Sequence, residues 1–264
     1  MKIVAAQISC ALGDLKGNVR KVREFSSRAK KSGAELIVFP EMVDTGYSMP
    51  TIQKHAAAWK EGAVPELQRI ASELSLAIVC GLSERDGASI YNAQVLVDAN
   101  GEITAKYRKT HLVRAAPLDE RNCFSPGNEF VSCKIDKFKL GLSICYDLRF
   151  PEMCRTLALE HDVNVFVNSS AWPFVRVEHL RILALARAIE NQSYLVLASR
   201  VGTDDGVTFC GTSAIIDPYG AIVAAASADR EELLEAEISK EVIDSVRDQM
   251  AIFAHRRAEL YKKG

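Results

Sequence analysis

The chain has 264 residues, of which 48% are hydrophobic and 25% are charged, a composition typical of a globular protein with a sizeable core. Its 33 lysines and arginines nearly balance 34 aspartates and glutamates, so a formal net charge of -1 gives no reason to expect nucleic acid or an anionic membrane as partner. No apolar run approaches the ~20 residues that cross a bilayer, and the N-terminal stretch lacks the apolar core of a signal peptide. We therefore expect a cytoplasmic protein with no membrane partner.

Apolar runs typical of strands alternate with helical patterns along the first half of the chain. Strands are predicted at residues 3–8, 35–39, 77–81, 93–97, 103–107, 131–135 and 140–145, and helices at 16–31 and 65–74. Asn100 and Gly101 predict a hairpin turn between the strands at 93–97 and 103–107.

The second half repeats this alternation. Helices are predicted at residues 152–160 and 177–192, strands at 163–167, 194–198, 213–216, 221–225 and 233–236, and helical segments after them. No stretch resembles a linker, so we expect one domain spanning residues 1–264. Strands that alternate with helices predict an α/β fold in which helices cover the sheets and sites form at strand ends.

Seven cysteines occur, at positions 10, 80, 123, 133, 145, 154 and 210. No two of them form a CxxC pair, so a zinc ribbon or a thioredoxin-like motif is unsupported and no metal site is expected. The odd number suits a reducing cytoplasm better than a disulfide framework. Most of these cysteines should be small core residues.

Cys145 is different because it stands where an apolar strand gives way to polar residues. A thiol needs a base or a neighbouring cation before it becomes a good nucleophile. Glu41 follows the strand at 35–39, and Lys109 follows the strand at 103–107. Each alone could be an ordinary surface charge, but the ends of such strands converge on one crevice, where the three side chains could form a site.

Other catalytic signatures are missing from the sequence. The chain has no GxSxG, GxGxxG or GxxxxGK[ST] pattern, which leaves a serine elbow and phosphate-binding loops unsupported. Its five histidines are scattered, and His179, on a predicted helix, is more often a packed or surface residue than a catalytic one.

At these residues the chain resembles the nitrilase superfamily of carbon–nitrogen hydrolases. The matching motifs, in family order, are "LIVFPE" (36–41), "YRKTHL" (107–112), "SPG" (125–127), "GLSICYDLRFPE" (141–152), "LARAIENQSY" (185–194) and "DPYG" (217–220). The resemblance implies a four-layer α-β-β-α sandwich and a catalytic triad of Glu41, Lys109 and Cys145, with Glu120 as a further glutamate beside it. It also implies a homodimer that packs through helical faces, for which residues 177–192 are a candidate, and no metal or organic cofactor.

The implied chemistry is hydrolysis of a small-molecule amide. Glu41 would accept the thiol proton, Cys145 would form a thioester, and Lys109 with the backbone N–H of Tyr146 would hold the oxyanion. Classical nitrilases tend to have Trp-Glu after the cysteine, whereas this chain has Tyr146 and Asp147, which favours an amidase over a nitrilase.

The substrate is predicted from the residues that follow Cys145. Arg149 could clamp a substrate carboxylate, or it could pair with Asp147 or Glu152. Trp172 and Arg176 are expected to line the same pocket. The resemblance is to amidases acting on small carboxylate-bearing amides, so an ω-amidase-like enzyme for 2-oxoglutaramate or succinamate is the first hypothesis.

Several alternatives stay open. They are hydrolysis of an N-carbamoyl amino acid, deaminated glutathione, a simple aliphatic amide or, less favoured, a nitrile. From other classes come a non-catalytic binding protein on the same scaffold and a thiol sensor with Cys133 or Cys154 as the resolving partner.

Overall fold

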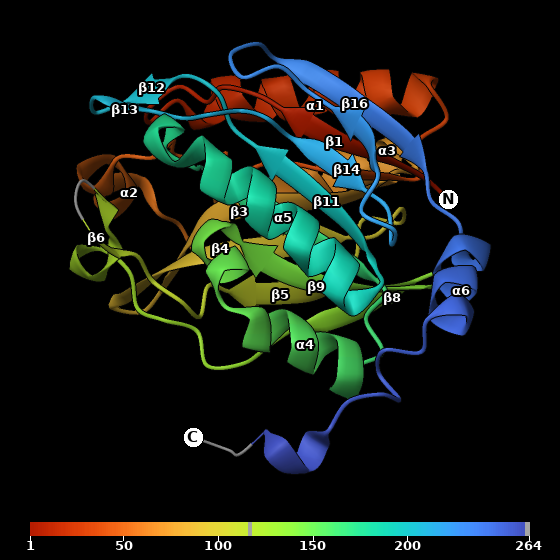
Figure 1. The fold of residues 1–264 in the computed structure, drawn as a ribbon. Helices are drawn as coiled ribbons and strands as arrows, with labels where there is room; N and C mark the ends of the chain where they lie inside the picture. The colour runs from red at the N-terminus through yellow and green to blue at the C-terminus, as the bar shows by residue number, and fades with distance from the viewer. Residues whose placement is uncertain (116–117, 262–264) are drawn as a thin grey trace.

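The computed structural model describes residues 1–115 and 118–261, and its centre is a pair of six-stranded sheets (Figure 1). The first sheet has the order β16 (Glu232–Glu237), β1 (Lys2–Gln7), β2 (Leu36–Val38), β3 (Ala77–Asp86), β4 (Ser89–Val97), β5 (Ile103–Arg108). The second has the order β15 (Ile222–Ala225), β14 (Ala214–Ile216), β11 (Tyr194–Ser199), β10 (Val165–Ser170), β9 (Phe138–Ile144), β8 (Ser132–Ile135).

Helices cover the outer face of each sheet. On the first sheet lie α1 (Leu15–Lys31) and α3 (Val64–Leu74), and on the second lie α4 (Pro151–Glu160) and α5 (Val177–Asn191) (Figure 1). This arrangement is the four-layer α-β-β-α sandwich that the sequence motifs predicted, and the fold prediction is confirmed.

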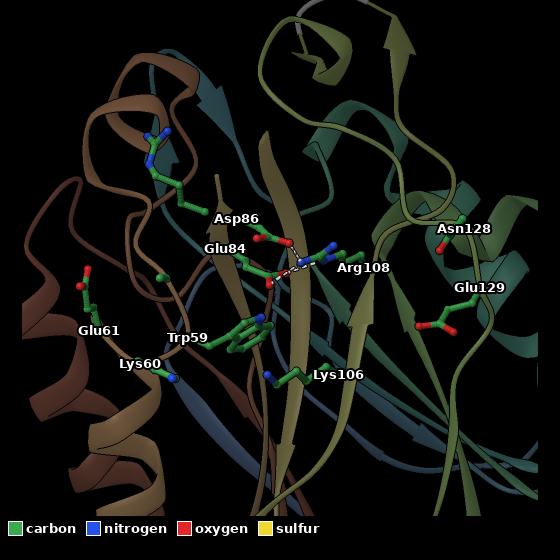
Figure 2. A pocket seen from close by; sticks show the side chains of 11 residues that line it. Trp59, Lys60, Glu61, Glu84, Asp86, Lys106, Arg108, Asn128 and Glu129 are labelled. Carbon is green, nitrogen blue, oxygen red and sulfur yellow. Dashed lines mark hydrogen bonds and ion pairs between the residues drawn. The ribbon is translucent and has the colours of Figure 1, made fainter. Parts of the chain in front are cut away.

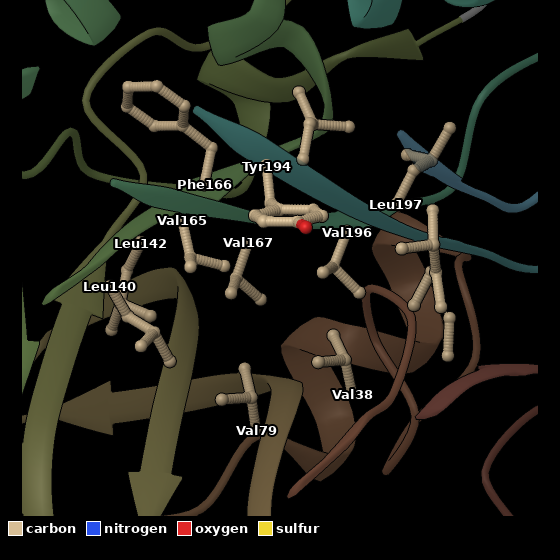
Figure 3. Close-up of a cluster of buried hydrophobic side chains, with 14 of the residues drawn as sticks. Val38, Val79, Leu140, Leu142, Val165, Phe166, Val167, Tyr194, Val196 and Leu197 are labelled. Atoms are coloured by element: carbon tan, nitrogen blue, oxygen red, sulfur yellow. The ribbon is translucent and has the colours of Figure 1, made fainter. Parts of the chain in front are cut away.

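The core between the two sheets consists of side chains from alternate strand positions. Val38 and Val79 of the first sheet face Val165, Val167 and Val196 of the second (Figure 3). The intervening residues face the helices: Ile37 joins a cluster that contains α1 and α3 side chains. Because both faces of these strands are buried, their sequences are continuous apolar runs rather than alternating ones.

The helix α1 illustrates how the sequence builds an outer layer. Asp14 caps it by accepting a hydrogen bond from the backbone N–H of Gly17, at 3.0 Å. Val22 and Phe25 share one face with Val19 and Ala29, and this face is buried against the first sheet.

The directions of the strands determine the edge of the sandwich at which the site lies. β1, β2 and β3 are parallel, as are β9, β10 and β11. β4 is antiparallel to β3 and β5 is antiparallel to β4, so β5 runs in the same direction as β3. The carboxyl ends of the two sets meet at one edge of the sandwich, where Glu41, after β2, accepts a hydrogen bond from the backbone N–H of Ala171, after β10. Sites form at such edges.

Several elements differ from the sequence expectation, and three of the differences bear on the layout of the fold. β3 continues past Gly81 to Asp86, because it forms a long hairpin with β4. β10 begins at Val165 and runs on to Ser170 through three polar residues, each buried between neighbouring strands. The short helix α2 (Met49–His55) was not predicted.

The further pieces are the two-stranded pairs β6 (Arg114–Ala115) with β7 (Leu118–Asp119) and β12 (Thr203–Asp204) with β13 (Val207–Thr208), and the helix α6 (Lys240–Gln249). Across the described ranges, no helix has both the length and the apolar character that crossing a membrane requires.

Candidate active site

Four predicted residues come together at this edge of the sandwich. Glu41 follows β2, Lys109 follows β5, Cys145 follows β9, and Glu120 begins a short 3-10 helix (Glu120–Asn122). All four are buried, with exposed fractions of 0% for both glutamates, 1% for Lys109 and 5% for Cys145. Charged side chains are seldom fully buried unless they are paired.

The pairing centres on the ammonium group of Lys109. Its Nζ lies 3.0 Å from Oε1 of Glu41 and 2.8 Å from Oε1 of Glu120. The other oxygens are also bonded: Oε2 of Glu41 accepts from the backbone N–H of Ala171 at 2.7 Å, and Oε2 of Glu120 accepts from that of Val113 at 2.7 Å. Each carboxylate thus has a fixed orientation.

Burial and neighbouring charges set the protonation of this group. Burial would lower the pKa of Lys109, but Glu120 and Glu41 outweigh it and hold that pKa well above its usual value, so the ammonium stays charged. The pKa of Glu41 is raised, chiefly by burial and further by Glu120, while Lys109 and a hydrogen bond from Asn92 act in the opposite direction. A carboxylate with a raised pKa is suited to accept a proton.

Cys145 is the first residue of a short 3-10 helix (Cys145–Arg149) and has a φ of 45°, in the left-handed region that non-glycine residues rarely adopt. Burial raises the pKa of its thiol well above the usual value, and the charge of Glu41 raises it further. The ammonium of Lys109 and the backbone N–H of Ala171 lower it. The thiol therefore needs a partner that removes its proton.

Cys145 opens into a cavity of about 250 Å³, which suits a small molecule. The predicted substrate residues Tyr146, Arg149, Trp172 and Arg176 all line it. The cavity is also lined by Tyr47, Val113, Ala115, Leu118, Ala171, Pro173 and His179. Its wall is mostly apolar, with cationic groups from Arg149 and Arg176.

Arg149 forms no ion pair with Asp147 or Glu152, the carboxylates near it in the sequence. Its guanidinium lies 4.7 Å from the centre of the Trp172 ring and 5.5 Å from that of Tyr146. Within the described ranges, its polar neighbour is Nδ1 of His179, which lies 3.3 Å from the guanidinium. The alternative in which Arg149 pairs with Asp147 is therefore wrong, because Asp147 is fully buried and turned toward a different segment.

Several residues of the site were missed by the sequence analysis. Asn92, on β4, donates to Glu41 and Glu120, and the hydroxyl of Tyr47 donates to Oε1 of Glu120 at 2.5 Å. The sequence could have indicated Asn92, because an amide inside the apolar run "YNAQVLV" needs a buried hydrogen-bond partner. Tyr47 lies outside any regular element and carried no such signal.

A larger cavity, of about 620 Å³, lies elsewhere and contains none of these groups (Figure 2). Part of its charge is paired, since the guanidinium of Arg108 contacts Glu84 at 2.7 Å and Asp86 at 2.8 Å. Arg108 also stacks on Tyr91, 3.8 Å from the ring centre. The described residues that line this cavity include no cysteine, serine, threonine or histidine.

Metal ligation finds no support in the residues that the structure covers, where no cluster of three or more His, Cys, Asp or Glu side chains could hold an ion. The seven cysteines are all free thiols. The chemistry available at the site is thus that of a buried thiol, a carboxylate base and an ammonium group.

Comparison with known proteins defines the class. A sequence model of the carbon–nitrogen hydrolase family matches residues 2–248, and the chain therefore belongs to that family. The resemblance to the nitrilase superfamily is confirmed, and the protein is an enzyme of the carbon–nitrogen hydrolase type.

Several of the similar proteins are named amidases, and others are named nitrilases. The chain is 33% identical over 261 residues to the 2-oxoglutaramate amidase of Bacillus subtilis, with 98% of each chain covered. It matches the crystal structure of Nit3 of Saccharomyces cerevisiae, a member of branch 10 of the nitrilase superfamily, with a TM-score of 0.89, 30% identity and coverage of 97% and 96%. It also matches a variant amidase from Nesterenkonia sp. AN1 with a TM-score of 0.85, 27% identity and coverage of 99% and 95%. In that structure the acetamide moiety of fluoroacetamide is covalently attached to the active-site cysteine.

Proposed function

We propose that this chain hydrolyses a small carboxylate-bearing amide to the acid and ammonia through a thioester on Cys145. The observation that carries the proposal is the ammonium of Lys109, held between Glu41 and Glu120 in a buried site that adjoins Cys145. In this proposal Glu41 is the base, Lys109 stabilises developing negative charge, and Glu120 fixes Lys109.

In the first half of the reaction, Glu41 takes the thiol proton and the sulfur of Cys145 attacks the amide carbonyl carbon. The carbonyl oxygen becomes an oxyanion, which Lys109 and the backbone N–H of Tyr146 stabilise. The C–N bond then breaks, and the proton on Glu41 passes to the departing nitrogen, so that ammonia leaves and a thioester remains.

In the second half of the reaction, water is the nucleophile and the sulfur of Cys145 is the leaving group. Glu41, again ionised, removes a proton from a water molecule, whose oxygen attacks the thioester carbonyl. The same donors stabilise the second oxyanion, the C–S bond breaks, and the sulfur of Cys145 recovers the proton. No other group has to supply or accept electrons in this scheme.

The substrate carboxylate is proposed to bind at the cationic side of the cavity. Arg149 and Arg176 both line the cavity, and the guanidinium of Arg149 lies 4.7 Å from the centre of the Trp172 ring and forms no ion pair with a carboxylate among the described residues. A guanidinium fork suits bidentate binding of a carboxylate. A volume of about 250 Å³ suits a dicarboxylate monoamide such as succinamate or 2-oxoglutaramate, and the similarity to the Bacillus subtilis enzyme supports this choice.

We further propose that the chain is a single domain and acts as a homodimer in the cytoplasm. The outer face of α5 carries Ile182 and Ile189, which are 62% and 50% exposed, and Ile189 lies against the turn at Gly220. An exposed apolar face of this kind is typical of an interaction site. Light scattering after gel filtration should give twice the chain mass, and Ile182→Glu should shift it toward the monomer.

The test of function is ammonia release from a panel of compounds: succinamate, 2-oxoglutaramate, butyramide, N-carbamoyl-β-alanine and a short nitrile. Turnover is expected to be fastest with the first two. Activity confined to the nitrile or the carbamoyl compound would contradict the proposal, and release from none of the five would favour a binding protein.

Cys145→Ala is the matching variant. It should abolish ammonia release while leaving the thermal unfolding midpoint within a few degrees of the parent, since it removes only a sulfur atom. A folded Cys145→Ala protein that retains substantial activity would refute the nucleophilic role.

A further inference from the structure

Asn92 bonds to the carboxylates of Glu41 and Glu120 through its side chain and to Lys109 through the backbone. Its Nδ2 donates to Oε1 of Glu41 at 2.6 Å and to Oε1 of Glu120 at 3.1 Å. Its backbone carbonyl accepts the N–H of Lys109 at 2.8 Å. Asn92 is itself fully buried, on the central part of the β3–β4 hairpin rather than on a loop.

The chemistry of a primary amide fits this position. An asparagine Nδ2 has two hydrogens, so one amide can donate to two carboxylates at once. The reverse orientation would place Oδ1 against the same two oxygens and is excluded by repulsion. The amide therefore lies between two like charges and donates to both.

The orientation of Glu41 follows from this arrangement. Its Oε1 accepts from Asn92 and Lys109, and its Oε2 accepts from the backbone N–H of Ala171. These donors come from β4, from the end of β5 and from the end of β10. Because they belong to both sheets, the carboxylate is held from both sides of the sandwich.

We propose that Asn92 is a positioning residue that holds Glu41, Lys109 and Glu120 in one arrangement and keeps Glu41 oriented for its role as base. The inference rests on the proposed role of Glu41 in proton transfer. Asn92 does not touch the reacting atoms; it acts through the carboxylate.

Removal of Asn92 should shift the pH dependence of the reaction in a definite direction. The titratable groups that act on Glu41 are Lys109, Glu120 and Cys145, and Tyr47 reaches it through Glu120. The hydrogen bond from Asn92 favours ionised Glu41 and so lowers its pKa. Removing Asn92 should raise the pKa of Glu41, and the acid limb of kcat/KM should move to higher pH.

The experiment compares the pH dependence of kcat/KM for succinamate in the parent, Asn92→Leu and Asn92→Ala. Hydrogen bonds to charged groups are strong enough that the acid limb should move up by about one pH unit, and kcat at neutral pH should fall about tenfold or more. KM should change less than about threefold, because the amide does not contact the substrate. The smaller alanine variant keeps the test usable if leucine prevents folding.

Gln94→Leu is the matched control. Gln94 lies two residues along the same strand, is equally buried and donates to Oγ of Ser169 at 2.7 Å, but it contacts neither carboxylate. It should lower stability without moving the acid limb. An unmoved acid limb in folded Asn92 variants, or an equal shift in Gln94→Leu, would overturn the inference.

The variant Glu41→Gln distinguishes a failure of the proposed function from a failure of the role proposed for Asn92. An active Glu41→Gln enzyme would refute the proposed function itself. An inactive Glu41→Gln together with Asn92 variants that keep the parent profile would refute only the role of Asn92.

Discussion

Oδ1 of Asp147 lies 2.8 Å from Nδ1 of His111, and this contact joins the turn that carries Cys145 to the segment that carries Lys109. The other oxygen of Asp147 accepts from the hydroxyl of Tyr107 at 2.7 Å and from the backbone N–H of Ile144 at 2.8 Å. His111 in turn stacks on Phe150, with ring centres 3.8 Å apart. A buried carboxylate thus bridges the two strand ends that hold the proposed nucleophile and its cation.

Asp147→Asn should therefore lower both stability and activity. An amide cannot accept all of these hydrogen bonds, so we expect a loss of about 3 kcal/mol in the free energy of unfolding and a fall in kcat of at least about tenfold. Urea unfolding and ammonia release measure the two effects. Asp136→Asn, in an exposed turn with a positive φ of 50°, is the control and should change neither. An Asp147→Asn enzyme as stable and active as the parent would contradict the bridging role.

Arg149→Gln should impair carboxylate-bearing substrates selectively. Losing a charged hydrogen-bonding partner should raise KM for succinamate about 10- to 100-fold, while butyramide, which has no carboxylate, should be affected less than about threefold. Steady-state kinetics on both amides measures the difference. Arg181→Gln, whose parent side chain pairs with Glu178 on the exposed face of α5, is the matched control. Equal losses on the two amides would argue that Arg149 only supports the pocket wall.

The buried Asp44 should make stability depend on pH. Burial raises the pKa of its carboxyl from the usual 3.8 to about 6, although hydrogen bonds from Ser83 oppose the shift. The folded state thus favours the protonated form, so the stability that this proton confers is present below about pH 4 and is lost as the pH rises through about 6.

Asp44→Asn removes this titration. Two pKa units correspond to about 3 kcal/mol, so the free energy of unfolding of the parent should fall by about that amount relative to the variant between about pH 4 and pH 7. Urea unfolding at several pH values gives both curves. Parallel curves for parent and variant would show that Asp44 has an ordinary pKa in the folded protein.

Gly81→Ala should disturb Glu41 through the backbone. A Cβ at this position would lie 2.6 Å from the carbonyl oxygen of Pro40 and 2.7 Å from Cα of Glu41, so the chain that carries the base has to move. We expect a stability loss of about 1–3 kcal/mol and a fall in kcat larger than any change in KM. Gly87→Asn is the control, because its neighbourhood is open and asparagine tolerates its φ of 58°. Full activity in Gly81→Ala would show that Pro40 and Glu41 can shift without cost.

The sequence predicted the parts of the site that stand at strand ends. Glu41, Lys109 and Cys145 each follow an apolar run, and parallel strands bring such positions to one edge. Asn92 could not be placed in this way, because its role depends on the register of β4 against β5, which puts Ala93 opposite Arg108 and brings Asn92 to Lys109. That register is a property of long-range pairing, which a single strand does not encode.

The partner of Arg149 escaped prediction for a different reason. Nearby carboxylates in the sequence left a local ion pair open as one of two alternatives, but the backbone turn at Cys145 directs Asp147 toward His111 and Arg149 toward Trp172. Residues two apart in such a turn face different surroundings, and only the three-dimensional path of the chain separates them.

The net charge of the cluster around Lys109 does not change when a proton moves from Cys145 to Glu41. With Glu41 ionised and Cys145 neutral, the four buried side chains carry one positive and two negative charges; with the proton on Glu41 and the sulfur ionised, the sum is the same. Moving the proton from sulfur to carboxylate therefore relocates a charge within the interior without adding one. The surrounding apolar wall meets no new net charge at that step, so a deeply buried thiol can become reactive without drawing an ion in from the solvent.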